Sequence, residues 1–472
     1  MKHKALHIVG APALFLLLAS VPVAGVPYAI RASLGLLAWM SWWWIANPVH
    51  LAITGFLPII VSALFGVVPV GTILPLYAEQ LLFLLIGAGT LATLWRRWGL
   101  DRRIAIVSLM TIGTDPRRHI VAWFVVAAIL SAVLPNAVVA AALMPVAIAM
   151  LRFIGIERLD ASAFGSALLI AIAWGTSVGG MGTPLGGAHN LLAVQLLERG
   201  LLHREFIYST WITRLLPITL LLTTASAVFM WVAFPPEISR IDGSPDYFAQ
   251  ELQTLGPMST PERWGLVLFS AATLLAFTRE FYAARFPGLT PAMVFLTFAV
   301  VSFLVRHKGV ALLEWPYAES HMVWGLIYLF AGGSALGQIL SDTGTAKFIA
   351  DGITPFVGGG AFSSIVVFTL ITLVIKQIMS NTATVAVMLP ITITTFTGLG
   401  LNPVPYVYIV TAAANMGLML PPASAGPAIA AGFGVNLKAM AWKGLWLTIV
   451  IWVLLVGIGY ALAVAWPGFS VA

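Results

Sequence analysis

The 472-residue sequence contains no cysteine, which excludes disulfide bonds, thiolate catalysis and cysteine-ligated metal sites. Charged residues are also scarce, since they make up 9% of the chain where a soluble domain carries roughly 25%. So few charges cannot cover a water-facing surface. The sequence also lacks a cluster of Asp, Glu and His residues of the kind that a membrane-embedded enzyme needs. These deficits argue against a soluble protein and against an enzyme.

Apolar sequence is what the chain has in excess. Hydrophobic residues make up 60% of it, and the mean hydropathy is +0.98. Runs such as 51–70, 213–234 and 441–466 contain no acidic residue and reach the ~20 residues that span a bilayer. The sequence therefore predicts an all-α integral membrane protein. Its eleven expected spans lie near 9–26, 30–47, 51–70, 80–98, 162–197, 210–234, 262–279, 288–305, 321–340, 404–433 and 441–466.

The net charge of +7 does not indicate a nucleic-acid partner. The basic residues gather at the ends of apolar runs, as at Arg96, Arg97, Arg102 and Arg103, and this pattern sets the orientation of a membrane protein. Most of them fall inside when the N-terminus is cytoplasmic. We expect a multi-pass protein of a bacterial inner membrane, surrounded by lipid, whose first apolar stretch is retained as a span.

Two further apolar segments, 115–153 and 355–398, break in the middle at a polar or proline-containing tip. Pro135 and Asn136 mark the first tip, and Ser380, Asn381 and Thr382 mark the second. Each half reads as short for a full crossing, so we expect two re-entrant helical hairpins. Such tips must be buried in protein or line an aqueous cavity, because hydrocarbon cannot satisfy an exposed turn.

The two hairpins also mark an internal repeat. A proline follows nine residues after Asn136 and again nine residues after Asn381, and each hairpin precedes a span interrupted by Gly and Pro. Broken segments at matching positions of two halves point to the binding site of a transporter. The predicted division is an N-terminal span 1–29, a first inverted repeat 30–235 with broken helix 162–197, a cytoplasmic linker 236–261, and a second repeat 262–472 with broken helix 404–433.

The second tip has the chemistry of an anion site. Helix starts carry roughly half a positive charge and unpaired N–H groups, and Ser380, Asn381 and Thr382 add hydroxyl and amide donors. The alternative is a helix cap or an interhelical polar contact, which is common in membranes.

These motifs resemble those of the divalent anion:sodium symporters, a family that carries di- and tricarboxylates and sometimes sulfate. The family has a Ser-Asn-Thr triplet at each of two tips, and Ser380-Asn381-Thr382, followed by Met388-Leu389-Pro390, matches it. The resemblance implies an eleven-span inverted-repeat fold, a homodimer, and elevator-type movement of the domain that holds both tips. Other matching stretches lie in family order at 39–44, 97–103, 115–118, 179–190 and 324–333.

The resemblance also implies a set of site residues. Substrate ligands would be Asn136, Gly187, Ser380, Asn381, Thr382, Ser424 and Ala425, and we add Lys376 on its own chemistry. Cation-site candidates would be Ser131, Pro135, Asn136, Gly186, Lys376, Met379, Asn381 and Ala423. The first tip departs from the family pattern, because it reads Pro135-Asn136-Ala137 and so lacks two hydroxyls. The first broken span departs as well, since it reads Gly187-Ala188-His189-Asn190.

Lys376 is the most informative departure, since the family usually has at this position a threonine that helps to hold a second sodium ion. A buried charge costs at least ~2.5–3.5 kcal/mol at a helix centre, so it needs compensation. We expect a pocket of backbone carbonyls, with the ammonium group as a tethered cation in place of that sodium. The alternative is a snorkelling or interhelically bonded lysine. No Asp or Glu is expected in the core.

His189 titrates near neutral pH in its unperturbed state and could couple protons, or it is a satisfied helix histidine. The sequence as a whole predicts a secondary active transporter of small divalent organic anions of the C4-dicarboxylate class. Transport would proceed by anion exchange or by Na⁺-coupled symport, with no cofactor beyond Na⁺ as coupling ion. The alternatives are a carrier of a sulfate-like oxyanion or a larger organic acid, a membrane-embedded enzyme, and a passive channel.

Overall fold

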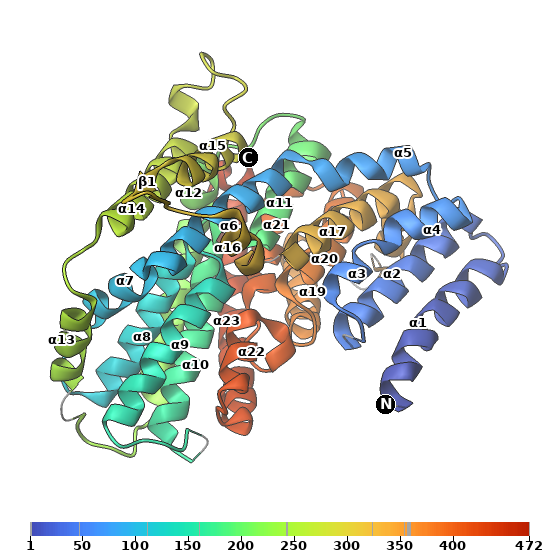
Figure 1. The fold of residues 1–472 in the computed structure, drawn as a ribbon. Coiled ribbons are helices and arrows are strands. Elements are labelled where there is room, and N and C mark those ends of the chain that lie inside the picture. The colour runs from blue at the N-terminus through green and yellow to red at the C-terminus, as the bar shows by residue number, and fades with distance from the viewer. Residues whose placement is uncertain are drawn as a thin grey trace.

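The computed structural model describes residues 2–46, 48–110, 112–159, 161–241, 244–322, 324–353, 355 and 360–471. It is an assembly of helices (Figure 1). Within these residues the only sheet is the antiparallel pair of β1 (Arg306–His307) and β2 (Val310–Ala311). The mostly helical architecture confirms the predicted class.

The first half of the chain forms twelve α-helices and four shorter turns in the described part. The helices before the first tip are α1 (Lys2–Ser20), α2 (Tyr28–Ala46), α3 (Leu51–Thr54), α4 (Leu57–Phe65), α5 (Val70–Ile73), η1 (Leu74–Ala78), α6 (Gln80–Trp98), α7 (Leu100–Leu109) and α8 (Pro116–Ser131). Those after it are α9 (Asn136–Phe153), α10 (Ala163–Gly179), η2 (Gly180–Gly182), η3 (Pro184–Gly186), α11 (Ala188–Leu197), the π-helical turn η4 (Glu198–Leu202) and α12 (Tyr208–Ala233).

The second half has a corresponding series. It begins with α13 (Ser244–Leu255), α14 (Thr260–Phe277), η5 (Arg279–Phe281), α15 (Pro291–Leu304), α16 (Trp315–His321), α17 (Trp324–Asp342) and α18 (Thr345–Ile353). It continues with α19 (Ala361–Lys376), α20 (Asn381–Gly398), α21 (Val404–Asn415), η7 (Pro421–Ala423), α22 (Ala425–Gly432), α23 (Leu437–Ala465) and η8 (Pro467–Ser470).

Five helical stretches of the described chain are long and apolar enough to cross a membrane. They are Val70–Trp98, Asn136–Phe153, Ala163–Gly182, Tyr208–Ala233 and Leu437–Ala465. Helix α12 has apolar side chains on its exposed surface as well as on its buried surface. Trp211 and Leu222 are buried, whereas Leu220, Val228 and Val232 are exposed. A soluble amphipathic helix would turn polar residues outward. These features support a multi-pass membrane protein.

Two expectations about helix lengths are wrong. Helix α9 has 18 residues and is one of the five long stretches, so this half of the first hairpin is not short for a crossing. The expected single span 51–70 is broken at Gly55, where α3 ends and α4 soon begins. The break follows from close packing on α17, since a Cβ at Gly55 would overlap the Tyr328 carbonyl and the Tyr77 hydroxyl donates to the Gly55 carbonyl.

The expectation of a core without carboxylates is wrong at Glu79. This residue lies between η1 and α6 and is buried. Gln195 donates a hydrogen bond to its carboxylate, and Arg199 forms an ion pair with it. Burial is therefore compensated by an amide and a guanidinium from α11 and η4, as a buried charge requires.

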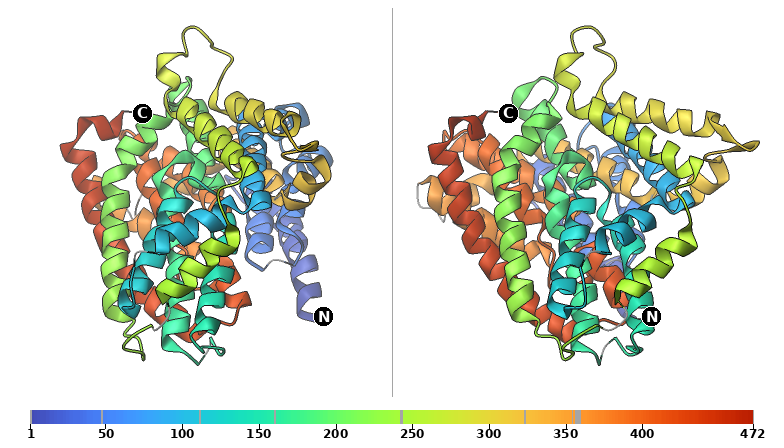
Figure 2. Two further views of the ribbon diagram at one scale, coloured as in Figure 1. Left: turned by 60° about the vertical axis from the view of Figure 1, so that its left-hand side comes forward. Right: turned by 90° about the vertical axis from the view of Figure 1, so that its left-hand side faces the viewer.

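The helices pack in two parts. In one part α6 packs against α14 and α15, and α17 packs against α3 and η1. In the other, α10 packs against α8, α9 and α22, while α21 packs against α11, α19, α20 and α23. Both tips and both broken spans belong to this second part, which we call the tip part; we call the first the flanking part. The left view of Figure 2 shows the N-terminal helices, in blue, beside the central bundle.

The segment 236–261 is tied to the first half rather than extended from it. Its helix α13 packs against α7 and α9, with Tyr247 and Phe248 buried. At its end Arg103 of α7 donates to the Glu262 carboxylate at 2.5 Å and to the Gly256 carbonyl at 2.9 Å. The linker therefore has a defined position.

Gly179 tests the packing that positions the first tip. A Cβ at this position would overlap the Ala128 backbone, so we expect Gly179→Ala to force α10 away from α8 at a cost of about 1–3 kcal/mol. Thermal unfolding followed by tryptophan fluorescence should show a lower midpoint. Gly457→Ala on α23 is the matched control, since a Cβ there would meet nothing within 4 Å. Equal midpoints for the two variants would contradict the close helix contact.

Candidate substrate and cation site

Each tip is a four-residue connection between two helices. Helix α8 ends at Ser131 and α9 begins at Asn136, while α19 ends at Lys376 and α20 begins at Asn381. Ser380 caps α20, because its hydroxyl accepts a hydrogen bond from the Ala383 N–H at 3.3 Å. Both asparagines therefore stand at the positive end of a helix dipole.

The first cluster is centred on Ser131. Its hydroxyl contacts Asn136 Oδ1 at 2.6 Å and the Thr176 carbonyl at 3.0 Å. A Cβ at Gly180 would lie 2.5 Å from Asn136 Oδ1, and one at Gly186 would lie 2.8 Å from the Ser131 carbonyl. The structure thus brings together Ser131, Asn136 and Gly186 among the predicted cation-site residues, and Pro135 is the residue just before α9.

The second cluster is centred on Lys376, which is fully buried. Its ammonium group donates to the Met379 carbonyl at 3.0 Å and to the Ala423 carbonyl. A Cβ at Gly417 would lie 2.6 Å from Nζ, so the absence of a side chain there makes room for the ammonium. Two backbone carbonyls thus accept hydrogen bonds from the ammonium group, so the side chain is not snorkelling, and the same contacts fit the alternative of an interhelically bonded lysine.

The two clusters occupy matching positions in the chain. Ser131 and Lys376 each stand five residues before the asparagine of their tip. Gly180 packs against Asn136 and Gly417 packs against Lys376, and Gly186 and Ala423 follow six residues after the two glycines. A hydroxyl in one half and an ammonium in the other therefore fill equivalent places.

Gln377 is a residue that sequence reasoning missed. Its amide nitrogen donates to the Met416 carbonyl at 2.9 Å and to the Leu373 carbonyl at 3.0 Å. Its amide oxygen accepts from the N–H groups of Leu418 and Met419. One side chain thus satisfies backbone groups that the break after α21 leaves free. Its only sequence signal was its place beside Lys376 in an apolar segment.

The two clusters are joined through the ends of α10 and α22. The Ser177 hydroxyl lies 3.4 Å from the Ser424 hydroxyl, and a Cβ at Gly426 would lie 2.6 Å from Thr176 Oγ1. Ser424 directly follows Ala423, whose carbonyl accepts a hydrogen bond from Lys376. The Thr176 carbonyl accepts a hydrogen bond from Ser131. Predicted residues from both halves therefore form one continuous region, which also places Ala425 at the start of α22.

His189 belongs to a second junction between the halves. Its Nε2 lies 2.6 Å from Asn415 Oδ1. The Asn415 amide donates to the Thr411 carbonyl and to Asn190 Oδ1, and Asn190 in turn donates to the Gly180 and Thr183 carbonyls at 2.7 and 2.8 Å. The imidazole therefore acts as the donor to Asn415. Sequence reasoning missed Asn415, although an amide at the end of an apolar helix was a signal.

The remaining predicted residues line the helix starts. Gly187 precedes α11, and a Cβ there would overlap the His189 ring. Thr382 and Asn381 are buried in the first turn of α20, and Asn381 Oδ1 has no hydrogen-bond partner among the described residues. A buried amide oxygen without a partner fits a cation or a donor group of a ligand.

A family model described as the transmembrane region of sodium:sulfate symporters matches residues 2–466. The chain belongs to this family. It is therefore a transport protein of the divalent anion:sodium symporter family and not an enzyme, as the resemblance predicted. The sodium-dependent dicarboxylate transporter SdcS of Staphylococcus saprophyticus is 26% identical over 444 residues, covering 91% of this chain and 85% of the relative. SdcS of Staphylococcus aureus is 25% identical over 442 residues, covering 90% and 85%.

Two solved structures share the fold. The YdaH transporter of Alcanivorax borkumensis aligns over 99% of both chains with a TM-score of 0.55 and 15% identity. MtrF of Neisseria gonorrhoeae aligns over 95% of this chain and 97% of its own, with a TM-score of 0.54 and 12% identity. At these identities the likeness supports a transporter fold for this family member and nothing finer.

The bond to Asn415 generates a prediction for His189. His189→Leu leaves the side-chain oxygen Oδ1 of Asn415 buried without the His189 donor, which should cost about 1–3 kcal/mol of stability. His189→Gln keeps an N–H donor and should unfold at a temperature closer to that of the wild type. Thermal unfolding of both variants checks this, with uptake measured between pH 6 and 8. A glutamine variant that is stable but has lost the pH dependence of uptake would instead assign His189 to proton coupling.

Proposed function

We propose that the protein is a secondary active transporter of small organic dianions of the C4-dicarboxylate class. The observation that carries the proposal is the Lys376 ammonium, bonded to the Met379 and Ala423 carbonyls within a region where helix starts converge. A fixed positive charge and N–H donors suit a substrate with two carboxylates. The relatives named sodium-dependent dicarboxylate transporters support the same substrate class.

In this proposal the substrate binds at the helix starts of both halves. Its ligands are Asn136, Gly187, Lys376, Ser380, Asn381, Thr382, Ser424 and Ala425. The first cluster, where Ser131, Asn136 and carbonyl oxygens gather, is the candidate site for a weakly coupled sodium ion. The first tip contributes an amide but no hydroxyl, so most of the side-chain donors come from the second half.

Lys376 takes the place of a second sodium ion. Carbonyl oxygens are ordinary ligands of hard cations, and an ammonium group satisfies the same two carbonyls by donating hydrogen bonds. A permanent charge makes the empty carrier reluctant to reorient across the membrane, and a bound dianion lowers that barrier. This favours exchange of one anion for another over symport with two sodium ions.

The proposal includes the membrane arrangement. The chain has eleven spans, and α8–α9 and α19–α20 are re-entrant hairpins of two inverted repeats. The N-terminus is cytoplasmic, in a bacterial inner membrane, and the protein is a homodimer. The tip part moves as an elevator against the flanking part. The two matching clusters and the packing of the helices into two parts support this arrangement.

Uptake of labelled succinate into proteoliposomes tests the function, with the Na⁺ gradient and internal succinate varied independently. We expect uptake that requires internal succinate and depends weakly on Na⁺. Competition by unlabelled sulfate serves as the control for substrate class. Sulfate uptake without succinate uptake would contradict the dicarboxylate assignment and favour the oxyanion alternative.

Lys376→Thr tests the tethered cation. We expect exchange without Na⁺ to fall by about tenfold or more, since a charge-assisted contact is lost, and added Na⁺ to restore part of it. Succinate exchange measured against external Na⁺ gives both results. Lys438→Thr, at the exposed start of α23, is the matched control for loss of a lysine and should leave exchange unchanged. A Lys376→Thr variant with normal exchange and no response to Na⁺ would refute the role.

A further inference from the structure

Glu79 connects the two parts of the molecule. Its carboxylate accepts a hydrogen bond from Gln195 Nε2 of α11, and Arg199 Nη1 of η4 lies 2.6 Å from its other oxygen. Ser334 of α17 joins the group, because its hydroxyl donates to Gln195 Oε1 at 2.9 Å. We call these four residues the interface cluster. Gln195 and Arg199 belong to the tip part, and Glu79 and Ser334 belong to the flanking part.

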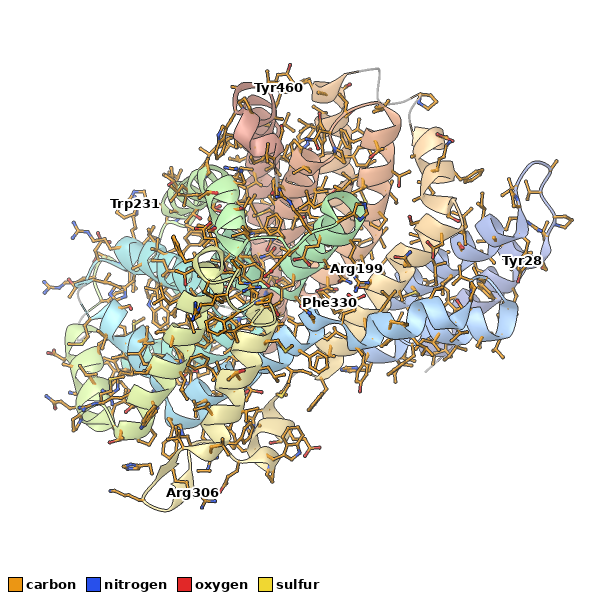
Figure 3. The ribbon with its side chains drawn as sticks, turned by 90° about the horizontal axis from the view of Figure 1, so that it is seen from above. Tyr28, Arg199, Trp231, Arg306, Phe330 and Tyr460 are labelled. Atoms are coloured by element: carbon orange, nitrogen blue, oxygen red, sulfur yellow. The ribbon has the colours of Figure 1, made fainter. Side chains whose placement is uncertain are left out.

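The interface cluster is linked rigidly to the candidate site. Gln195 and Arg199 lie on the continuous helical segment that starts just after Gly187, through α11 and η4. A displacement of the Gly187 end along the axis therefore carries Gln195 with it. Figure 3 shows Arg199 at the end of this green segment, in the same region of the view as Phe330 of α17.

Apolar packing is incomplete beside the cluster. A cavity of about 240 Å³ lies there, lined by Gln195, Arg199 and Ser334 and also by Pro390 and Thr394 of α20. Beside this cavity the hydrogen bonds and the ion pair join the two parts, while α17 and α18 pack against α20 elsewhere along the interface. Glu79 is 6% exposed, so its charge-assisted contacts are strong and leaving it unpaired is costly.

We propose that Glu79 is a latch between the two parts. It holds Gln195 and Arg199 against the flanking part in the conformation described, and it must release both whenever the tip part moves. The proposal rests on the elevator-type movement proposed above. Movement separates a buried carboxylate from Gln195 and Arg199 and requires new partners for it, so the interface cluster sets part of the barrier between conformations.

The absence of native cysteine allows the latch to be tested by cross-linking. A Cβ at Gly333 of α17 would lie 2.9 Å from the Ala386 Cβ of α20, closer than the ~3.5–4.5 Å between the Cβ atoms of a disulfide, so a small separation of the two helices lets Gly333→Cys with Ala386→Cys form one in this conformation. The initial rate of oxidative cross-linking in proteoliposomes then reports its population. Adding Glu79→Gln should lower that rate by about tenfold or more, the factor expected for one charge-assisted hydrogen bond.

Two further variants separate the latch from a general loss of structure. Glu314→Gln removes a carboxylate that pairs with Arg97 at 3.2 Å within the flanking part, and it should leave the cross-linking rate unchanged. Glu79→Gln combined with Gln195→Glu restores a carboxylate–amide pair across the interface and should recover much of the rate. Thermal unfolding of each variant confirms that it is folded.

The outcomes distinguish failure of the latch from failure of the movement. An unchanged rate in folded Glu79→Gln, with a cross-link that blocks succinate exchange, would overturn the latch alone. A complete cross-link that leaves succinate exchange at its normal rate would overturn the movement, and the latch with it. A lowered rate that the double exchange restores would establish the latch.

Discussion

A helix interrupted inside a membrane protein leaves N–H and C=O groups that hydrocarbon cannot satisfy, and the rest of this structure depends on how they are satisfied. Two buried side-chain amides carry most of that task. Gln377 bonds to three backbone groups within the break after α21, and Asn190 bonds to two carbonyls of the break after α10. The direction of α11 and of α22, and with it the direction of their dipoles, follows from these bonds.

The two halves solve the same geometric problem with different chemistry. Where the first half has the small neutral side chain of Ser131, the second has Lys376 bonded to two carbonyls. A serine at such a position leaves carbonyl oxygens available to a mobile ion, whereas a lysine satisfies them permanently. Two connections of equal length can therefore differ in the charges that they hold, and a single side chain makes that difference.

Much of the architecture could be predicted from the sequence, because apolar run length and Gly-Pro interruptions are local signals. Each expected span has a helix or a broken pair of helices, and Asn136 and Asn381 stand at helix starts as expected. The break at Gly55 and the burial of Glu79 could not be predicted, because both depend on partners in α17 and α11 that lie far away in sequence. Gln377 and Asn415 were missed for a related reason, since an amide in an apolar segment indicates a polar role but not the partners that it will bond.

The packing of His189 on Gly187 has an evolutionary consequence. Because any Cβ at position 187 would overlap the imidazole ring, the two positions share one volume. A side chain can be gained at 187 only after, or together with, a smaller or differently directed residue at 189. The order of substitutions is therefore constrained, and a homologue that carries a hydroxyl at the first position has passed through a change at the second. The pair should vary as one unit across related sequences.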